Sequence, residues 1–264
     1  KGRKLWSLRT TFSWSENTFA SSACSISGAG GIGSRIAKTC AAQGARVIIA
    51  SRDADKLNHV AAEINNQGLA CSAKACDVTD PDQVEKLMAD TEEEFGRIDV
   101  MVNNAGGAMF VKPPEKLRPE QWRAAIDLNL NSVFYCSAAA GQRMIQQGGG
   151  RILNISSVAG VKNSPAFVHY GAAKAGVINL TKSMAVCWGP HNINVNCIAP
   201  GLTATEGVAQ WLPPKTREDG SPVPPLEYPP DPQNVADLAL FLAAPGSARI
   251  SGEIFPIRAL NEIV

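Results

Sequence analysis

Residues 23–34 read ACSISGAGGIGS, and this stretch decides the fold. A short run with the character of a strand, Ala23–Ser27, leads into glycines at four of the next six positions, and a helical pattern starts at Ser34. Glycines at such a junction let the backbone approach a pyrophosphate, whose charge is favoured at a helix N-terminus. A glycine-rich turn alone can be a simple tight turn, but its place after a strand in a βαβ unit favours a nucleotide site.

Outward from this turn, short apolar runs alternate with longer amphipathic segments. Alternation at this spacing calls for parallel strands joined by right-handed crossovers. The strands we predict are Ala23–Ser27, Arg46–Ala50, Leu69–Cys76, Asp99–Asn103, Arg151–Ser156, Ile193–Ile198 and Glu253–Ile257. The helices we predict are Ser34–Gln43, Ala54–Asn66, Pro81–Glu94, Pro119–Gln147 with a break near Asp127, His169–Cys187 and Asp231–Ala244. The pattern predicts one α/β domain over residues 23–264, a Rossmann-type doubly wound parallel sheet flanked by helices, after an irregular segment 1–22.

Composition excludes several classes of protein. The 264 residues are 45% hydrophobic and 19% charged, so the chain can bury a large core. A net charge of +1 gives no electrostatic reason to expect nucleic acid or an anionic membrane as partner, and no apolar run reaches the length of a membrane span. Seven cysteines without a C-x-x-C pair, and only three histidines, argue against a disulfide framework and a metal site. We therefore expect a reducing, cytoplasmic compartment.

Proline is concentrated near the C-terminus. Residues 200–232 hold nine of the 17 prolines, so this stretch is neither ordinary helix nor central strand. Long irregular segments inside a compact domain are commonly functional, and we predict a substrate lid here.

Cofactor choice depends on the end of the second strand. A carboxylate there would bind the ribose hydroxyls of NAD, whereas an arginine would pair with the 2′-phosphate of NADP. Ser51 stands at the strand end, Arg52 follows it, and Asp53 fits the N-cap of the helix Ala54–Asn66. The sequence favours NADP(H) over NAD(H), the alternative being that Arg52 is a solvated surface charge.

Polar residues follow other strands at the edge where open α/β sheets bind ligands. Asp77-Val78 and Asn103–Gly106 are two such groups, although each alone could be a turn feature. Ser157 follows the fifth strand, and Tyr170 and Lys174 are four residues apart on one helix face. An ammonium and a positive nicotinamide ring would lower the pKa of a phenol from about 10 toward the range useful for acid–base catalysis. The serine hydroxyl, the tyrosine phenol and the lysine ammonium are together the groups needed to reduce a carbonyl by hydride transfer.

Over residues 23–258 the chain resembles the short-chain dehydrogenase/reductase family. The resemblance rests on the order and spacing of Gly31-Ile32-Gly33, Asp77, Asn103–Gly106, Asn129, Ser157, Tyr170, Lys174, Pro200-Gly201 and Thr205. It implies that Tyr170 exchanges a proton with the substrate oxygen and that Ser157 polarises this oxygen. It further implies that Lys174 holds the nicotinamide ribose and lowers the pKa of Tyr170, and that Asn129 supports a water that relays protons to Lys174.

The same resemblance implies the remaining site. Adenosine contacts would come from Asp77, Val78 and Asn104, and contacts to the nicotinamide amide and phosphates from Thr203 and Thr205. The full set of cofactor residues we expect is Ser27, Gly28, Gly31, Ile32, Gly33, Ser51, Arg52, Asp77, Val78, Asn104, Ala105, Gly106, Tyr170, Lys174, Thr203 and Thr205. Family members are usually homotetramers, and we expect a homotetramer or homodimer packed through the helices at 131–147 and 169–187.

The chain departs from the family pattern at both ends. The family opens its glycine motif with Thr-Gly and three further residues before the next glycine. Here either Ser27-Gly28 takes that place and the turn is one residue short, or Ile26-Ser27 replaces Thr-Gly. The first strand is also unusually polar, with Ser21, Ser22 and Ser25, yet we expect it to form because the centre of the sheet must be filled. The usual Asp-Gly-Gly after the last strand is missing.

Three functions remain open. The first is an NADP(H)-dependent carbonyl reductase or alcohol dehydrogenase acting on a small carbonyl or alcohol substrate. The second is a catalytically idle NADP-binding sensor or scaffold, which the complete catalytic set disfavours. The third is a reductase of 3-oxoacyl thioesters, whose acidic carrier would call for more cations than Lys215 and Arg217 in the lid. We favour an apolar ketone bound by Met109, Phe110 and Trp211, with Leu212 and Tyr228 nearby in the lid.

Overall fold

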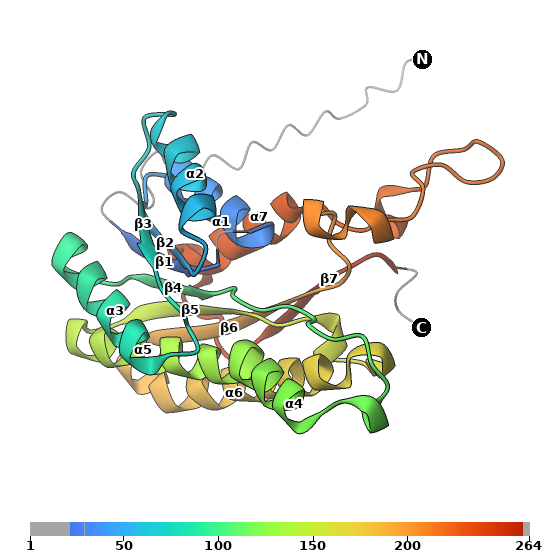
Figure 1. Cartoon of the computed structure of the whole chain (residues 1–264). Coiled ribbons are helices and arrows are strands. Elements are labelled where there is room, and N and C mark those ends of the chain that lie inside the picture. The colour runs from blue at the N-terminus through green and yellow to red at the C-terminus, as the bar shows by residue number, and fades with distance from the viewer. Residues whose placement is uncertain (1–21, 29, 261–264) are drawn as a thin grey trace, which may run out of the picture.

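The computed structural model describes residues 22–28 and 30–260, so the predicted irregular segment 1–22 lies outside the described residues except for Ser22. Seven strands form one parallel sheet in the order β3-β2-β1-β4-β5-β6-β7 (Figure 1). The strands are β1 Ala23–Ser27, β2 Arg46–Ser51, β3 Cys71–Ala75, β4 Val100–Asn103, β5 Gly150–Ile155, β6 Ile193–Pro200 and β7 Ile254–Ile257. The order reverses between β1 and β4, which is the doubly wound topology that the sequence predicts. The switch point beside β1 is where such sheets bind ligands.

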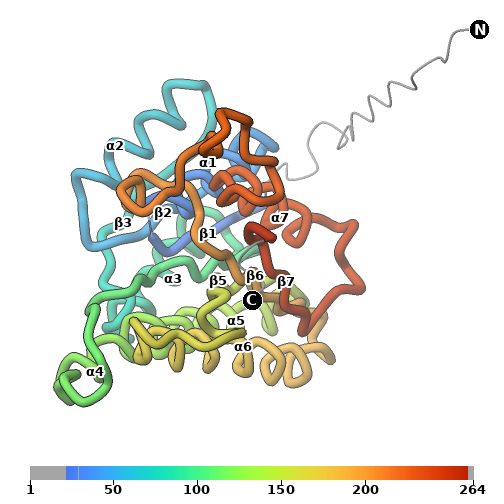
Figure 2. Tube along the Cα trace, turned by 90° about the vertical axis from the view of Figure 1, so that its right-hand side faces the viewer, coloured from blue at the N-terminus to red at the C-terminus, as the bar shows by residue number. Residues whose placement is uncertain are grey.

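Helices cover both faces of the sheet (Figures 1 and 2). On one face lie α1 (Ile32–Ala42), α2 (Ala54–Asn65) and α7 (Pro232–Ala243), and on the other lie α3 (Pro81–Phe95), α5 (Ser132–Gln147) and α6 (Val168–Trp188), with α4 (Pro119–Ile126) beside them. Each face has its own buried apolar cluster, because the Val- and Ile-rich strands send alternate side chains to opposite sides. The predicted bounds of strands and helices are met to within two residues in every case.

The polar first strand forms as predicted. Within it, Ile26 pairs with Ile49 of β2 on one side and with Val102 of β4 on the other, so β1 lies at the centre of the sheet. The hydroxyl of Ser27 donates to the Val102 carbonyl at 3.3 Å. The hydroxyl of Ser25 is fully buried and has no hydrogen-bond partner in the part of the chain that the structure describes. An unpaired buried hydroxyl costs about 1–3 kcal/mol, which the pairing of β1 with two neighbours outweighs.

The predicted break near Asp127 is a change of helix type. A π-helical turn, Asp127–Asn131, joins α4 to α5 without interrupting the helical path. Turns of this kind carry one extra residue and are frequent at functional sites. Here the turn contains Asn129, which is fully buried.

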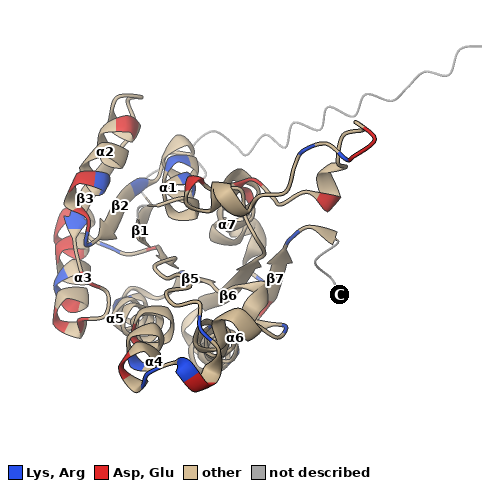
Figure 3. Cartoon of the chain, turned by 45° about the vertical axis from the view of Figure 1, so that its right-hand side comes forward, with Lys and Arg blue, Asp and Glu red and all other residues tan. Residues whose placement is uncertain are grey.

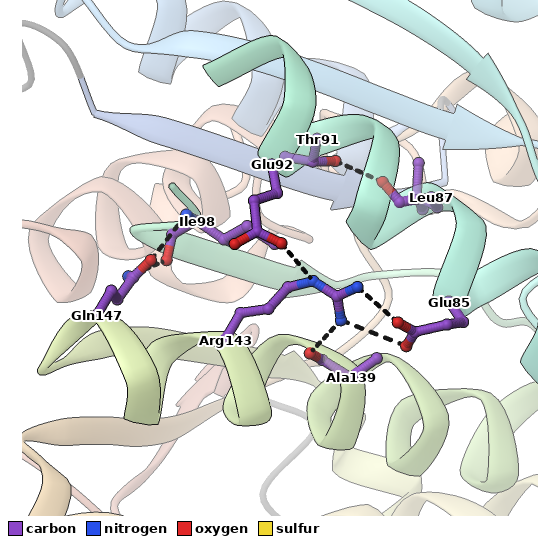
Figure 4. Close-up of polar contacts among 8 residues, drawn as sticks. All are labelled: Glu85, Leu87, Thr91, Glu92, Ile98, Ala139, Arg143 and Gln147. Carbon is purple, nitrogen blue, oxygen red and sulfur yellow. Dashed lines mark hydrogen bonds and ion pairs between the residues drawn. The ribbon is translucent and has the colours of Figure 1, made fainter. Parts of the chain in front are cut away.

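An ion-pair cluster fixes α3 against α5 (Figure 4). Arg143 of α5 lies 2.6 Å from a carboxylate oxygen of Glu85 and 3.3 Å from one of Glu92, both on α3. Hydrogen bonding to Arg143 holds the pKa of Glu85 below its usual value. The Arg143 side chain is only 11% exposed, whereas the side chains of Glu85 and Glu92 are 57% and 51% exposed.

The proline-rich stretch between β6 and α7 projects beyond the edge of the sheet where the strands end (orange in Figure 1). It contains two short 3₁₀ turns, Glu206–Trp211 and Pro225–Glu227, and one isolated bridge between Thr216 and Pro222. Acidic and basic residues are intermixed over the surface (Figure 3). Among the described residues, no helix combines the length and apolar character that a membrane crossing requires.

Candidate active site

A cleft of about 1050 Å³ runs along the carboxyl ends of the central strands. It starts at the glycine turn after β1 and reaches the ends of β5 and β6. Eleven of the residues that the sequence assigns to cofactor or catalysis line it: Gly28, Gly31, Ile32, Asn104, Ala105, Gly106, Ser157, Tyr170, Lys174, Thr203 and Thr205. Segments that are far apart in the sequence therefore meet in one cavity.

The glycine turn is shaped by close backbone contacts. Gly28 has φ 92°, and a Cβ on Gly33 would overlap the carbonyl oxygen of Gly28. Only glycine allows α1 to begin so close to the end of β1. The hydroxyl of Ser27 accepts from the backbone N–H groups of Asn104 at 3.1 Å and Ala105 at 3.2 Å, which ties the turn to the strand end next to it.

Ser27 is the last residue of β1 and pairs with Ala50 of β2 and Asn103 of β4, so the glycine turn begins at Gly28. The alignment of Ser27-Gly28 with the family's Thr-Gly, which makes the turn one residue shorter than the family pattern, stays a prediction.

Ser157, Tyr170 and Lys174 come together at the other end of the cleft. Ser157 follows β5, its hydroxyl lies 3.4 Å from the Pro200 carbonyl oxygen, and it shares a hydrogen bond with Tyr170. One turn along α6, the ammonium of Lys174 lies 5.7 Å from the centroid of the Tyr170 ring. The spacing of four residues places both side chains on the face of α6 that borders the cleft.

Burial controls the proton affinities at this end. It raises the pKa of Tyr170, an effect that the hydrogen bond to Ser157 partly opposes. It lowers the pKa of Lys174 to about 8, although Lys174 still donates to the Ile155 carbonyl at 2.8 Å. The sequence led us to expect a lowered pKa for Tyr170. The groups of the chain alone have the opposite effect, so a lowered pKa would need the positive charge of an oxidised nicotinamide ring.

Asn129 lies beneath the cleft. Its side-chain amide donates to the carbonyl oxygens of Gly107 and Ala125, at 3.1 and 3.0 Å, and its Oδ1 accepts from the Gly107 N–H at 2.8 Å. A Cβ on Gly106 would lie 2.7 Å from Asn129 Oδ1 and 3.1 Å from Lys174 Nζ. Asn129 therefore fixes the loop after β4 beside Lys174, while the predicted water relay stays a prediction.

Four of the predicted cofactor residues, Ser51, Arg52, Asp77 and Val78, lie at or just after the ends of β2 and β3, outside the lining of the cleft, whereas Asn104 lines it. Arg52 Nη1 lies 3.7 Å from Asp77 Oδ2, and the Arg52 side chain is 67% exposed. Burial pushes the pKa of Asp77 upward, but hydrogen bonds from Thr79 and the charge of Arg52 together hold it below its usual value. Asp53 accepts from the Lys56 N–H at 3.0 Å and caps α2, as the sequence predicts. Ser51 is the last residue of β2, and Val78 follows the end of β3 by three residues.

The predicted substrate contacts are more dispersed. Phe110 packs against the buried ring of His169 at a centroid distance of 5.8 Å, and Met109 and Trp211 are 41% and 63% exposed. None of the three predicted residues lines the large cleft in this structure. Their role as substrate contacts stays a prediction.

Sequence reasoning missed contacts made by the backbone. The Ile155 carbonyl that receives the Lys174 ammonium, and the Lys174 carbonyl that accepts the Ser156 hydroxyl at 2.7 Å, have no sequence signal. Lys56 was also missed, although it lines the cleft beside the glycine turn. Its position in the first turn of the helix that follows β2 could have pointed to it.

A glycine turn, a switch-point cleft and a Ser–Tyr–Lys group define the class as dinucleotide-dependent oxidoreductases of the Rossmann type. The short chain dehydrogenase family matches residues 22–215, and the chain belongs to this family, whose members bind a nicotinamide cofactor. It is therefore an NAD(P)-dependent dehydrogenase that acts on CH–OH donors.

Two curated proteins and one solved structure illustrate the similarity. The chain is 35% identical over 233 residues to a 7alpha-hydroxysteroid dehydrogenase of Escherichia coli K12, covering 88% of this chain and 91% of that protein. It is 36% identical over 237 residues to a 3-oxoacyl-[acyl-carrier-protein] reductase of Synechocystis, covering 86% and 91%. A 7alpha-hydroxysteroid dehydrogenase solved with NADH and 7-oxo glycochenodeoxycholic acid superposes with a TM-score of 0.85 at 33% identity, covering 93% of this chain and 96% of that one.

Proposed function

We propose that the chain is an NADP(H)-dependent oxidoreductase that interconverts a ketone and a secondary alcohol, with Tyr170 as general acid and base. The observation that carries this proposal is the position of Ser157, Tyr170 and Lys174 in the same cleft as the glycine turn. A dinucleotide whose phosphates lie at the N-terminus of α1 would extend along the cleft toward these three residues.

The cleft fits such a cofactor. Gly28, Gly30 and Gly31 line one end of the cleft without side chains, and Thr203 and Thr205 line it from the segment after β6. The nicotinamide ring would supply or accept the hydride. The residues of the chain would position the substrate and handle the proton.

Ser157 and Tyr170 present two linked hydroxyls to one carbonyl oxygen. In reduction, Tyr170 would donate its proton to that oxygen while the Ser157 hydroxyl stabilises the developing negative charge. Lys174, with a pKa of about 8, exchanges its proton easily near neutral pH and would return a proton to Tyr170. Asn129 would keep the loop after β4 in place beside Lys174.

The preference for NADP(H) rests on basic residues at the adenosine end. Arg52 directly follows the end of β2, where no carboxylate is available for the ribose hydroxyls except Asp53, and Asp53 caps α2. We therefore retain NADP(H) over NAD(H).

For the substrate we propose an apolar ketone in preference to a carrier-bound thioester. Apolar side chains form part of the lining of the cleft, among them Ala108, Leu202 and Val208. Arg217, one of the two cations in the proline-rich segment, lies 2.8 Å from Glu227, which offsets the charge that it could present to an acidic carrier. We propose this segment as the substrate lid, with Met109, Phe110 and Trp211 contacting the substrate when the lid closes over it.

We also propose a homotetramer that packs through α5 and α6 in a reducing, cytoplasmic compartment. Apolar residues are exposed on both helices, with Phe134 at 48% and Val186 at 79%, and all seven cysteines are free. Sedimentation velocity tests the assembly, and a monomer at micromolar concentration would refute it.

The Tyr170→Phe variant tests the mechanism, because it removes only the transferable proton. We expect NADPH binding to survive while turnover of ketones falls by about 10²–10⁴. A panel of ketones and 3-oxoacyl thioesters is assayed by loss of nicotinamide absorbance at pH 7. Tyr135→Phe, on α5 and outside the cleft lining, is the matched control and should retain activity. Equal turnover of the Tyr170 variant and the wild type would exclude the mechanism, and NADPH binding without turnover of any substrate would favour an idle binding protein.

A further inference from the structure

The end of the cleft between α1 and α2 carries an excess of positive charge. The titratable side chains that line it there are Arg35, Lys38, Lys56, His59 and Glu63. The charge of Glu63 is compensated by Lys38 at 2.8 Å, and His59 lies 3.6 Å from the same carboxylate. Arg35 and Lys56 have no ion pair with any residue that the structure describes.

The other acidic residues of the cleft, Glu206 and Asp231, belong to the segment between β6 and α7. Asp231 caps α7 by accepting from the Gln233 N–H at 2.8 Å. The α1–α2 end of the cleft therefore favours an anion.

Lys56 reaches from the first turn of α2 to the glycine turn. A Cβ on Gly30 would lie 3.1 Å from Lys56 Nζ, so the ammonium sits directly against the backbone of that turn. The Lys56 backbone N–H is held by Asp53, which follows the end of β2 by two residues. The Lys56 side chain thus spans the space between the glycine turn and the end of β2.

The glycine turn supplies no charge of its own. Residues 27–33 contain only serine, glycine, alanine and isoleucine. Any positive charge beside this turn must come from neighbouring elements, and Lys56 is the cation in contact with it.

Arg52 is less well placed than its position in the sequence suggests. Its guanidinium lies 3.7 Å from the Asp77 carboxylate, toward the end of β3, and Arg52 is not part of the cleft lining. Asp77 offsets part of the charge of Arg52. Of Arg52 and Lys56, only Lys56 lines the cleft, and it has no ion pair with a described residue.

We propose that Lys56 is the specificity-determining residue for the 2′-phosphate of NADP(H), with Arg52 in a supporting role. The inference rests on the proposed function, because it assumes that a dinucleotide lies in the cleft with its adenosine end beside β2. A lysine ammonium is a compact point charge that binds phosphate without requiring the planar geometry of an arginine pair.

The test compares two small probes that differ by the phosphate in question. Binding of 2′,5′-ADP and of 5′-AMP is measured by isothermal titration calorimetry, without substrate or turnover. We expect the wild type to prefer 2′,5′-ADP. We expect Lys56→Gln to weaken 2′,5′-ADP by about tenfold and 5′-AMP by less than twofold, and Lys56→Arg to restore the preference.

Two further variants serve as comparison and control. Arg52→Gln should weaken 2′,5′-ADP by a smaller factor than Lys56→Gln does. Lys86→Gln removes the same charge on α3, where Lys86 pairs with Asp90 and lies outside the cleft lining, and should change neither affinity.

The possible failures are distinguishable. Equal losses of both probes in Lys56→Gln, or a loss of 2′,5′-ADP confined to Arg52→Gln, would overturn the assignment of Lys56. A wild type that prefers 5′-AMP would overturn it as well and leave an NAD(H)-dependent dehydrogenase. A wild type that binds neither probe nor any dinucleotide would remove the proposed function together with the inference.

Discussion

Replacing Lys174 with methionine is expected to change the pH dependence of stability in a way that follows from its burial. Lys174 is only 2% exposed, and burial lowers its pKa from 10.5 to about 8. At pH 7 the unfolded chain holds this proton more tightly than the folded chain. At about 1.4 kcal/mol per pKa unit, the charge of Lys174 costs the folded state about 3 kcal/mol near neutral pH.

The sign follows from the number of protons bound in each state. Between pH 8 and 10.5 the unfolded chain binds more protons at this site than the folded chain, so the stability of the wild type rises with pH. In Lys174→Met this contribution is absent. The free energy of unfolding of the wild type, minus that of the variant, should therefore rise by about 2 kcal/mol between pH 7 and 9.5.

The variant also loses the hydrogen bond to the Ile155 carbonyl, which costs about 1–3 kcal/mol at every pH in this range. The relief of about 3 kcal/mol at pH 7 offsets this loss, so Lys174→Met should be at least about as stable as the wild type there, although inactive. At pH 9.5 it should be the less stable of the two. This pH dependence is expected if Lys174 is retained for catalysis although its buried charge lowers the stability of the folded chain.

The assay is urea denaturation of the cofactor-free protein, followed by circular dichroism at pH 7, 8, 9 and 9.5. Lys182→Met removes an exposed lysine from the same helix and serves as the matched control. The difference in the free energy of unfolding between the wild type and this control should not change with pH. If the difference between wild type and Lys174→Met does not change with pH, or falls as pH rises, the account of Lys174 as a buried charge is refuted.

Two further predictions concern stability. Gly33→Ala should destabilise the chain by about 1–3 kcal/mol or more and weaken NADPH binding, because its Cβ would overlap the Gly28 carbonyl, whereas Gly246→Ala, with open space around its Cα, should be neutral in thermal unfolding. Arg143→Ala should cost about 1 kcal/mol at pH 7 in urea denaturation, and a loss undiminished near pH 4 would contradict the role of the ion pair. The cost of Arg143→Ala should decrease at low pH, because the pKa of Glu85 is held below its usual value. The ion pair therefore stabilises the folded chain at pH values above the ordinary pKa of a glutamate, and this stabilisation is lost as Glu85 becomes protonated.

The sequence predicted the fold well because the signals for it are local. Alternating apolar runs and amphipathic segments placed every strand and helix, since strand and helix periodicities are properties of short stretches. The polar strand β1 was the exception, because its own composition disfavours burial. Pairing of Ile26 with Ile49 and Val102 outweighs the unpaired hydroxyl of Ser25, and such pairing is visible only in the assembled sheet.

Tertiary structure decided what the candidate site can do. Spacing alone placed Tyr170 and Lys174 on one face of α6, but the Ile155 carbonyl that holds Lys174 is a backbone group, which no residue type signals. Burial sets the pKa of both side chains, and burial depends on segments more than a hundred residues apart meeting at one edge of the sheet. The sequence drew attention to Arg52 because of its position after β2. Only the packing of the elements shows that Asp77 lies beside Arg52, that Glu63 pairs with Lys38, and that Lys56 lines the cleft without an ion pair to any described residue.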